Sequence, residues 1–273
     1  MKRMKILNPF NAPVFYEETV SSTMDISRRL ADDGCAHGTV ICADYQEAGR
    51  GRIPERQWLA EKKTSLPFTI LLRYAQIEDI PPAITLRTGL AVSLAVEDFI
   101  LVLQNEKEKK EEKKPPVKIF IKWPNDIMIG NKKAGGILTE NSGGIIHIGI
   151  GVNIAQKTFP LFLKEKAASI ALSSEIEIKP DDRFILLEKI LLRLYSELET
   201  DQSPLMPESK NWKQRIEQRF FKKDEQVIFK NGAAESEKEI KGTLTGISET
   251  GELLIIPEGE TTPRAYITGE LKY

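Results

Sequence analysis

The chain has 273 residues, 39 basic and 40 acidic side chains, a net charge of −1, and 41% hydrophobic residues. This balance is typical of a soluble globular protein and gives no indication of a nucleic-acid or membrane partner. Two cysteines and two histidines are too few for a disulfide framework or an expected zinc site. Because neither a signal peptide nor an apolar run of ~18–20 residues is present, we expect a cytoplasmic protein.

The first hundred residues alternate between extended and helical patterns. Ser21-Ser22-Thr23 offers a helix N-cap, and Gly34 is the expected end of that helix. A second helix is predicted from Pro81-Pro82 to about Leu103, with leucines along one side. Strands are predicted at Val14–Glu18, Thr39–Asp44 and Ser65–Tyr74.

A run of charged residues follows the second helix. The nine residues Glu106 to Lys114 comprise five lysines and four glutamates, and Pro115-Pro116 comes next. A nucleic-acid patch would need excess positive charge with aromatic residues between the lysines. This run nets only +1 and has no aromatic residue, so it predicts a solvated helix extension or loop.

The remaining chain predicts a sheet, two helices and a separate β segment. Strands are expected at Val117–Lys122, Ile127–Ile129, Gly136–Glu140 and Ile145–Ile150, with tight turns at Gly130-Asn131 and Gly143-Gly144. Amphipathic helices are expected at Arg183–Leu198 and Lys210–Phe221. After Lys222, short strands are expected at Gln226–Lys230, Glu239–Ile247, Glu252–Ile256 and Arg264–Ile267. We therefore divide the chain into a domain of residues 1–222 and a small barrel-like β domain of residues 223–273.

The run Tyr45–Arg52 is the most informative candidate site. It reads Tyr-Gln-Glu-Ala-Gly-Arg-Gly-Arg, which places two arginines beside two glycines. Glycine permits close approach of a ligand to the backbone, and the arginine guanidinium suits phosphate or carboxylate. The run predicts a loop that clamps an anion, although taken alone it is equally compatible with an ordinary solvated loop.

Three further segments carry polar groups at strand ends. Lys122–Asp126 reads Lys-Trp-Pro-Asn-Asp and could serve a phosphate or Mg²⁺, although it is also good turn chemistry. In Asn131–Leu138, Lys133 precedes small residues that allow close approach, whereas Lys132 is by default a surface lysine. Gly149–Asn153 reads Gly-Ile-Gly-Val-Asn and fits either a ligand wall or a bulge.

The order of these motifs resembles the biotin–protein ligase family. The chain presents Ser-Ser-Thr, Gln-x-x-Gly-Arg-Gly-Arg, Lys-Trp-Pro-Asn-Asp, Lys-x-Gly-Gly-Ile-Leu and Gly-x-Gly-x-Asn between Val14 and Asn153. The last fifty residues resemble the SH3-like domain of those enzymes. The resemblance implies an α+β fold: a class II synthetase-like, largely antiparallel mixed sheet with helices on one face, followed by a small SH3-like β-barrel.

The resemblance also implies a reaction in two steps. Biotin attacks the α-phosphate of ATP, with Mg²⁺, to give biotinyl-5′-adenylate. A lysine of a biotin carboxyl carrier domain of a biotin-dependent carboxylase then takes the biotinyl group, and AMP leaves. Such a transfer depends on positioning and electrostatic stabilisation, so the chain needs no protein nucleophile.

Site roles are carried over by resemblance. Lys133 and Arg50 are the implied catalytic residues, and Asp126 is the implied Mg²⁺ ligand. The implied biotin-binding residues are Ser22, Thr23, Met24, Gln46, Gly49, Arg50, Gly51, Arg52, Lys133 and Gly135. The implied ATP- or adenylate-binding residues are Arg50, Arg52, Trp58, Lys122, Trp123, Asn125, Asp126 and Asn153.

The sequence departs from the family pattern in three places. Met24 stands where many relatives carry a polar residue, so a side-chain hydrogen bond is not expected there. Ile53–Arg56 replaces a further Arg-Gly pair, with Arg56 as the substitute cation, and the charged run at Glu106–Lys114 has no counterpart.

Only twenty residues precede Ser21, too few for the helix-turn-helix domain of the bifunctional members, so we expect a monofunctional ligase. It could form a homodimer. A lipoate–protein ligase, which shares the chemistry, and a non-catalytic sensor of biotinyl-adenylate are the alternatives.

Overall fold

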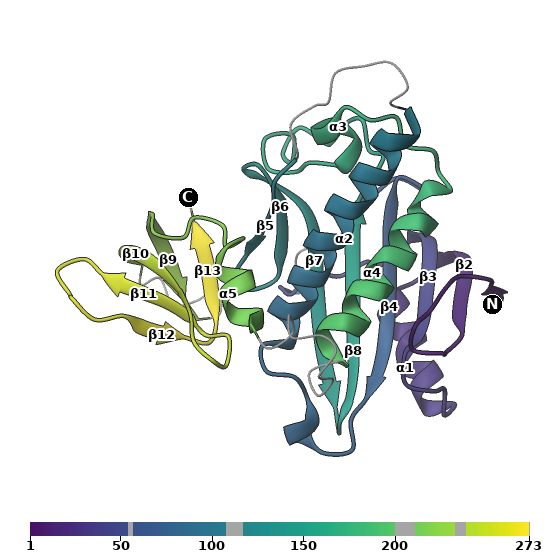
Figure 1. Ribbon diagram of the computed structural model, residues 1–273, viewed down its shortest axis with the longest axis horizontal. Helices are drawn as coiled ribbons and strands as arrows, with labels where there is room; N and C mark the ends of the chain where they lie inside the picture. The colour runs from purple at the N-terminus through teal and green to yellow at the C-terminus, as the bar shows by residue number, and fades with distance from the viewer. Residues whose placement is uncertain (54–56, 108–116, 200–210, 233–238, 273) are drawn as a thin grey trace.

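The structure is a computed structural model that describes residues 1–53, 57–107, 117–199, 211–232 and 239–272. Figure 1 shows a large sheet with helices packed on it and, at the C-terminal end of the chain, a smaller sheet. The predicted site residue Arg56 and most of the charged run lie outside the described residues.

The large sheet has eight strands in the order β1-β2-β3-β4-β8-β7-β6-β5. Strands β2 and β3 pair in parallel, and the other neighbouring pairs of this sheet are antiparallel. The predicted mixed, largely antiparallel sheet is thus confirmed. The bounds are β1 (Lys2–Met4), β2 (Val14–Val20), β3 (Thr39–Gln46), β4 (Ser65–Arg73), β5 (Ile119–Lys122), β6 (Asp126–Ile129), β7 (Lys132–Ser142) and β8 (Ile145–Asn153).

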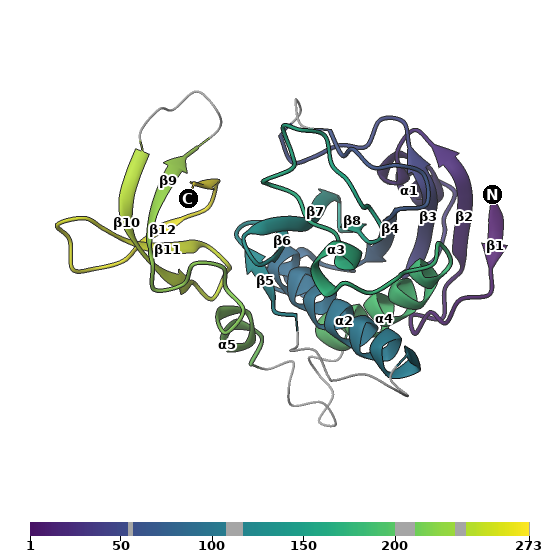
Figure 2. The ribbon, with the colours of Figure 1, turned by 90° about the horizontal axis from the view of Figure 1, so that it is seen from above.

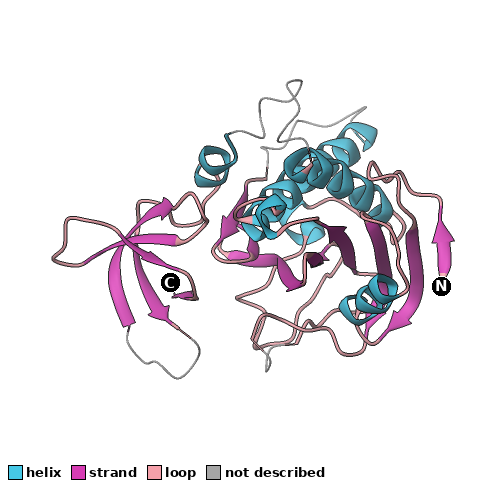
Figure 3. Cartoon of the chain, turned by 90° about the horizontal axis from the view of Figure 1, so that it is seen from below, coloured by secondary structure: helices cyan, strands magenta, loops and turns pink. Residues whose placement is uncertain are grey.

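Helices cover both faces of this sheet. The long helices α2 (Ile84–Lys107) and α4 (Asp182–Leu198) pack together on one face, and α1 (Thr23–Asp32) lies on the other (Figures 2 and 3). Strand β4 contacts the helices on both faces, because alternate side chains of a strand point to opposite faces of the sheet. Phe68 and Ile70 join the core beneath α2 and α4, whereas the hydroxyl of Thr69 donates to Thr23 of α1. The expectation of helices on one face alone is therefore wrong for α1.

The main core lies between the sheet and the helix pair. Phe68 of β4, Phe99 of α2 and Ile190 of α4 are fully buried there, together with Ile148 of β8 and its buried neighbours Ile146 and Ile150. Burying a large aliphatic or aromatic side chain contributes about 1.5–3 kcal/mol to folding. Within the described residues, no helix is long and apolar enough to cross a bilayer.

Local turn and cap signals appear where the sequence predicts them. Ser22 is the N-cap of α1, and its side chain accepts a hydrogen bond from the backbone N–H of Met24. Gly34, just beyond the end of α1, has a positive φ, as do Gly130 and Gly143 in the tight turns that flank β7. These conformations are open to glycine at little cost, which explains why the chain turns at these points.

Several short elements were not predicted, and one predicted helix is shorter. The additional elements are β1, the 3₁₀ turn η1 (Ile77–Asp79), α3 (Ile170–Ser174) and β13 (Gly269–Lys272). Helix α5 covers Trp212–Glu217, and the predicted start at Lys210 lies outside the described residues.

The C-terminal sheet is antiparallel throughout and has the strand order β12-β11-β10-β9-β13. Its core includes Phe229 and Leu244 but also Leu90 of α2, Trp123 and Trp212, so the two parts share a hydrophobic cluster. Closure into an SH3-like barrel and the boundary between residues 222 and 223 stay predictions. The bounds are β9 (Gln226–Asn231), β10 (Glu239–Ile247), β11 (Leu253–Pro257) and β12 (Arg264–Tyr266).

Candidate functional site

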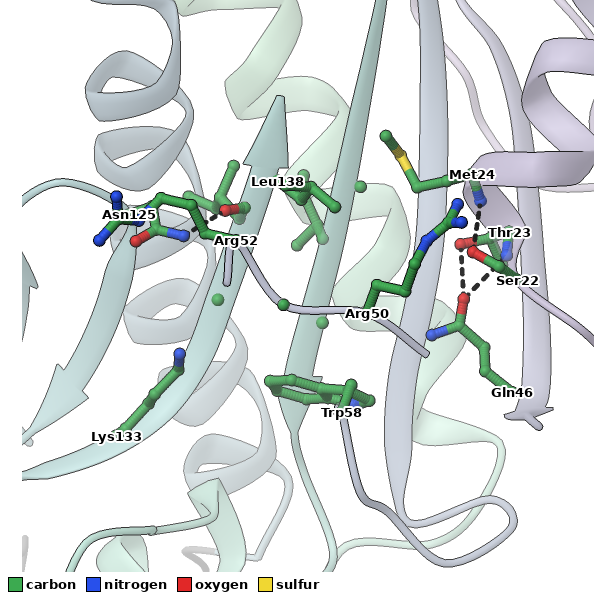
Figure 4. Close-up of a pocket in the computed structure, with 16 residues that line it drawn as sticks. Ser22, Thr23, Met24, Gln46, Arg50, Arg52, Trp58, Asn125, Lys133 and Leu138 are labelled. Atoms are coloured by element: carbon green, nitrogen blue, oxygen red, sulfur yellow. Dashed lines mark hydrogen bonds between the residues drawn. The ribbon is translucent and has the colours of Figure 1, made fainter. Parts of the chain in front are cut away.

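A hollow of about 540 Å³ lies on the α1 face of the large sheet, and we call it the site pocket. The residues come from the start of α1, the end of β3, the glycine–arginine loop and strands β7 and β8 (Figure 4). It is lined by Ser22, Thr23, Met24, Gln46, Arg50, Gly51, Arg52, Trp58, Asn125, Lys133, Gly136, Ile137, Leu138, Gly149, Ile150 and Gly151.

One end of the site pocket is a polar group fixed by the start of α1. The backbone N–H and the hydroxyl of Thr23 both donate to Oε1 of Gln46, at 2.8 and 3.0 Å. Thr69 of β4 in turn donates to the Thr23 hydroxyl at 2.8 Å. These bonds hold Gln46 and Thr23 in fixed orientations, which is what recognition of a polar head group requires.

A buried histidine fastens α1 to strand β8 behind this polar end. Ser27 Oγ and His147 Nδ1 are 2.8 Å apart, and both side chains are buried. Burial lowers the pKa of His147 below its usual value, so the imidazole is neutral at pH 7. The pair therefore supports the position of α1 without adding a charge.

The floor of the site pocket is formed by glycines on two neighbouring strands. In β8, Ile148 and Ile150 point into the core, so Gly149 and Gly151 between and beyond them face α1 and the pocket. A Cβ at Gly151 would lie 2.8 Å from the Trp58 ring, so only glycine lets the indole rest on the strand. The glycines thus create space at the floor.

Three cationic side chains reach the site pocket, and each has an acceptor in the protein. Lys133 Nζ lies 2.5 Å from Asp126 Oδ1, and Arg50 Nη2 lies 2.6 Å from Asp25 Oδ1. Arg52 Nη2 donates to the carbonyl oxygen of a residue in the C-terminal sheet, Gly269, at 2.9 Å. Figure 4 shows Lys133, Asn125 and Arg52 on the side away from Thr23 and Gln46. The pocket can therefore hold a ligand that is polar at one end and anionic at the other.

Most of the predicted site residues line this pocket. Those that do are Ser22, Thr23, Met24, Gln46, Arg50, Gly51, Arg52, Trp58, Asn125 and Lys133. Asp126 adjoins it through the ion pair with Lys133. Gly49 lies at the base of the loop, where an added Cβ would be 3.0 Å from the Gln46 amide nitrogen.

Besides Asp126 and Gly49, four predicted residues lie outside the lining. Trp123 packs against the C-terminal sheet, where its indole N–H donates to Gly251. Asn153 donates to the carbonyl of Ala168 and accepts from Gln156, and Lys122 is buried at the end of β5.

The fourth, Gly135, allows close strand packing, since a Cβ there would lie 3.0 Å from the carbonyl oxygen of Gly151. For all four residues, direct contact with a substrate stays a prediction.

The sequence predicts no individual role for Gly136, Leu138, Gly149 or Gly151, although Gly149–Asn153 fits a ligand wall or a bulge, and all four residues line the pocket. The available signal is the spacing of the glycines by two residues in a predicted strand. A spacing of two places both glycines on one face, and that face is then open for a ligand or a packed ring.

No group of three or more His, Cys, Asp or Glu side chains that could hold a metal occurs in the described part of the chain. Asp126 is the carboxylate beside Lys133. Magnesium commonly binds through one or two carboxylates together with substrate phosphates and water. Asp126 therefore fits an ion that arrives with a nucleotide triphosphate rather than a metal bound by the protein alone.

A known protein family matches more than half of this chain. Residues 16–154, which include the site pocket, match the Biotin/lipoate A/B protein ligase family. Among curated relatives, the bifunctional ligase/repressor BirA of Bacillus spizizenii is 34% identical over 66% of this chain. The biotin–[acetyl-CoA-carboxylase] ligase of Mycobacterium tuberculosis is 31% identical over 51% of this chain and 48% of its own length. The chain spans about half the length of the curated relatives it matches, with 51% of the Bacillus protein covered.

Solved structures are similar over nearly the whole chain. A biotin protein ligase mutant of Aquifex aeolicus in complex with biotin has a TM-score of 0.73 at 27% identity, covering 95% of this chain and 97% of its own. The Aquifex aeolicus ligase in complex with biotin and ATP has a TM-score of 0.68 at 27% identity over the same shares.

Proposed function

The chain belongs to the Biotin/lipoate A/B protein ligase family, and from that premise we propose that it is an ATP-dependent biotin–protein ligase. It joins biotin and ATP to form biotinyl-5′-adenylate and pyrophosphate. It then transfers the biotinyl group to a lysine of a biotin carboxyl carrier domain in a biotin-dependent carboxylase, with release of AMP.

The observation that supports this proposal is the division of one pocket into a hydrogen-bonding end at Thr23 and Gln46 and a cationic end at Lys133 and Arg52, with the Arg50 guanidinium near the first end paired to Asp25. Biotin has a polar cyclic urea at one end and a carboxylate at the other, so it matches this division. Thr23 and Gln46 supply a threonine hydroxyl and a glutamine amide for the urea. Lys133 and Arg52 lie where a carboxylate and a phosphate would meet.

The first step requires two anions to approach each other. A biotin carboxylate oxygen forms a bond to the α-phosphorus of ATP, and the bond from that phosphorus to the bridging oxygen of pyrophosphate breaks. Lys133 and Arg50 offset the repulsion and stabilise the charge that develops in transfer. Asp126 holds the Lys133 ammonium in place through their 2.5 Å contact. Asp126 is the residue that would hold a magnesium ion bound to the triphosphate, and such an ion would neutralise phosphate charge.

In the second step the neutral lysine amine of the carrier attacks the acyl carbon of the mixed anhydride. The bond from that carbon to the phosphate oxygen breaks, and AMP leaves. Trp58 and the glycine–arginine loop cover the pocket, which protects a hydrolysable anhydride from water. Arg52 retains the intermediate through its phosphate.

The family also contains ligases for lipoate, so lipoate is the second candidate acid. Lipoate carries an apolar disulfide ring in place of the cyclic urea. The paired hydroxyl and amide of Thr23 and Gln46 favour biotin, because its cyclic urea can form hydrogen bonds with such groups and the apolar disulfide ring of lipoate cannot.

The proposal extends to the setting of the enzyme. We place it in the cytoplasm, where the free thiols of Cys35 and Cys42 would stay reduced. We also propose a homodimer as a working assembly, and residues 223–273 as a distinct C-terminal domain. Size-exclusion chromatography with light scattering decides the assembly.

The decisive experiment measures pyrophosphate release from ATP and Mg²⁺ with biotin and with lipoate in parallel. We expect release with biotin, followed by incorporation of labelled biotin into an added carrier domain. Release with lipoate alone would transfer the protein to the lipoate branch. Biotin binding without any release would support a sensor of biotinyl-adenylate.

A further inference from the structure

Met24 places an apolar side chain at the polar end of the site pocket. It follows Ser22 and Thr23 in the first turn of α1, yet its side chain is only 4% exposed. Figure 4 shows it between Thr23 and Leu138, at the polar end of the pocket. An unbranched thioether at this point fills volume and donates no hydrogen bond.

The volume that Met24 fills is made available by Gly149 of β8. A Cβ added to Gly149 would lie 2.8 Å from Met24 Sδ and 3.1 Å from its Cγ. Gly149 does not have a positive φ, so its backbone is open to any residue, and the glycine is needed for space alone. The cross-strand partner of Gly149 is Leu138, which also lines the pocket.

Met24 and Leu138 therefore form an apolar wall at the end where Thr23 and Gln46 supply the polar groups. A ring that binds here meets hydrogen-bonding groups at one edge and apolar atoms on another side. Biotin presents this combination, because its cyclic urea is fused to a sulfur-containing ring.

Resting on the proposed function, we propose that Met24 is a specificity-determining residue that selects the ring system of the acid by volume. Its thioether and the missing side chain at Gly149 together set the depth of the pocket. Thr23 and Gln46 read the urea, and Met24 contacts the apolar part of the ring.

The test uses a double-mutant cycle and two acids, biotin and desthiobiotin, which lacks the sulfur atom and therefore the second ring. Met24→Ala should raise the KM for biotin by about tenfold and change kcat by less than about threefold. It should also lower the preference for biotin over desthiobiotin by about fivefold or more, since one methylene-sized contact in an apolar pocket is worth ~10–200-fold. Met24→Leu, which nearly conserves volume, should keep both values within about threefold.

The steric pairing predicts a specific coupling between Met24 and Gly149. Gly149→Ala should push the thioether into the pocket and raise the KM for biotin by about tenfold. Adding Met24→Ala should remove the clash, so the double variant should keep about the tenfold higher KM of Met24→Ala alone instead of the ~hundredfold increase that two independent effects would give. Gly151→Ala is the matched control, because its Cβ would meet Trp58 instead, so its effect and that of Met24→Ala should multiply. An unchanged preference in Met24→Ala, or effects that multiply with both glycine variants or with neither, would overturn the proposal.

The wild-type protein separates this result from the proposed function. If it releases pyrophosphate with lipoate but not with biotin, the proposed function fails. The same cycle, measured with lipoate, then decides the role of Met24. In addition, thermal unfolding without any acid should show that Met24→Ala reduces the destabilisation caused by Gly149→Ala, which tests the contact apart from turnover.

Discussion

Lys133→Ala offers the most direct test of the site. The side chain lines the site pocket, and its ammonium lies 2.5 Å from Asp126 Oδ1. Removing it deletes one cationic donor from the place proposed for the meeting of carboxylate and phosphate, and leaves Asp126 there as a negative charge without this partner. Loss of one donor to a developing oxyanion costs ~10²–10³ in kcat, or about 2.7–4 kcal/mol. We therefore expect adenylate formation to fall at least ~10²-fold.

The same substitution should have little effect on stability. The Lys133 side chain is 40% exposed and that of Asp126 is 20% exposed, so solvent screens their ion pair. Pairs of this kind contribute about 0–1 kcal/mol. A large decrease in the rate of adenylate formation with a nearly unchanged unfolding midpoint would therefore show that the substitution impairs catalysis and leaves the fold intact.

The assay is biotin-dependent pyrophosphate release, with kcat and the KM for biotin measured separately. Lys132→Ala is the matched control, because this neighbouring lysine contacts Lys164 and Glu165 outside the pocket. We expect its kinetics to stay within about twofold of the wild type. If Lys133→Ala turned over within about threefold of the wild type, Lys133 would have no part in the reaction.

Three further predictions concern the loop, the domain contact and pH. Arg52→Ala removes the bond to Gly269 and the proposed phosphate contact, so biotinyl-adenylate should leave faster in a filter-binding assay. Unchanged retention would mean that the loop is not the clamp. Trp123→Ala leaves a cavity in the hydrophobic cluster shared with the C-terminal sheet and should lower the free energy of unfolding by about 3–5 kcal/mol, measured with denaturant. A decrease below ~1 kcal/mol would show that the cluster is loosely packed. The hydrogen-bonded carboxylate of Glu199 raises the pKa of His37. The contribution of His37 to the stability of the fold is therefore complete below pH ~6.5 and is lost as pH rises through the raised pKa. Burial lowers the pKa of His147, so the free energy of unfolding falls as pH drops below ~6.5. Replacing His37 by Gln and replacing His147 by Gln should therefore change the slope of the unfolding free energy against pH in opposite directions. Slope changes in the same direction would contradict both assignments.

The sequence by itself determined the features that depend on neighbouring residues. The N-cap at Ser22, the end of α1 before Gly34 and the tight turns at Gly130 and Gly143 follow from local hydrogen bonding and from glycine's freedom at positive φ. The motif order indicated the family and most of the pocket lining, because each motif brings several of its residues to one short segment.

Only the tertiary structure decided which distant residues meet. That β4 pairs with β8, and that α1 lies opposite α2 and α4, depends on contacts between segments far apart in the chain. The same holds for Met24 on Gly149 and for Trp123, which packs into the C-terminal sheet. A one-residue change in strand register would reverse the face of every side chain in a strand, so no local pattern could assign these partners.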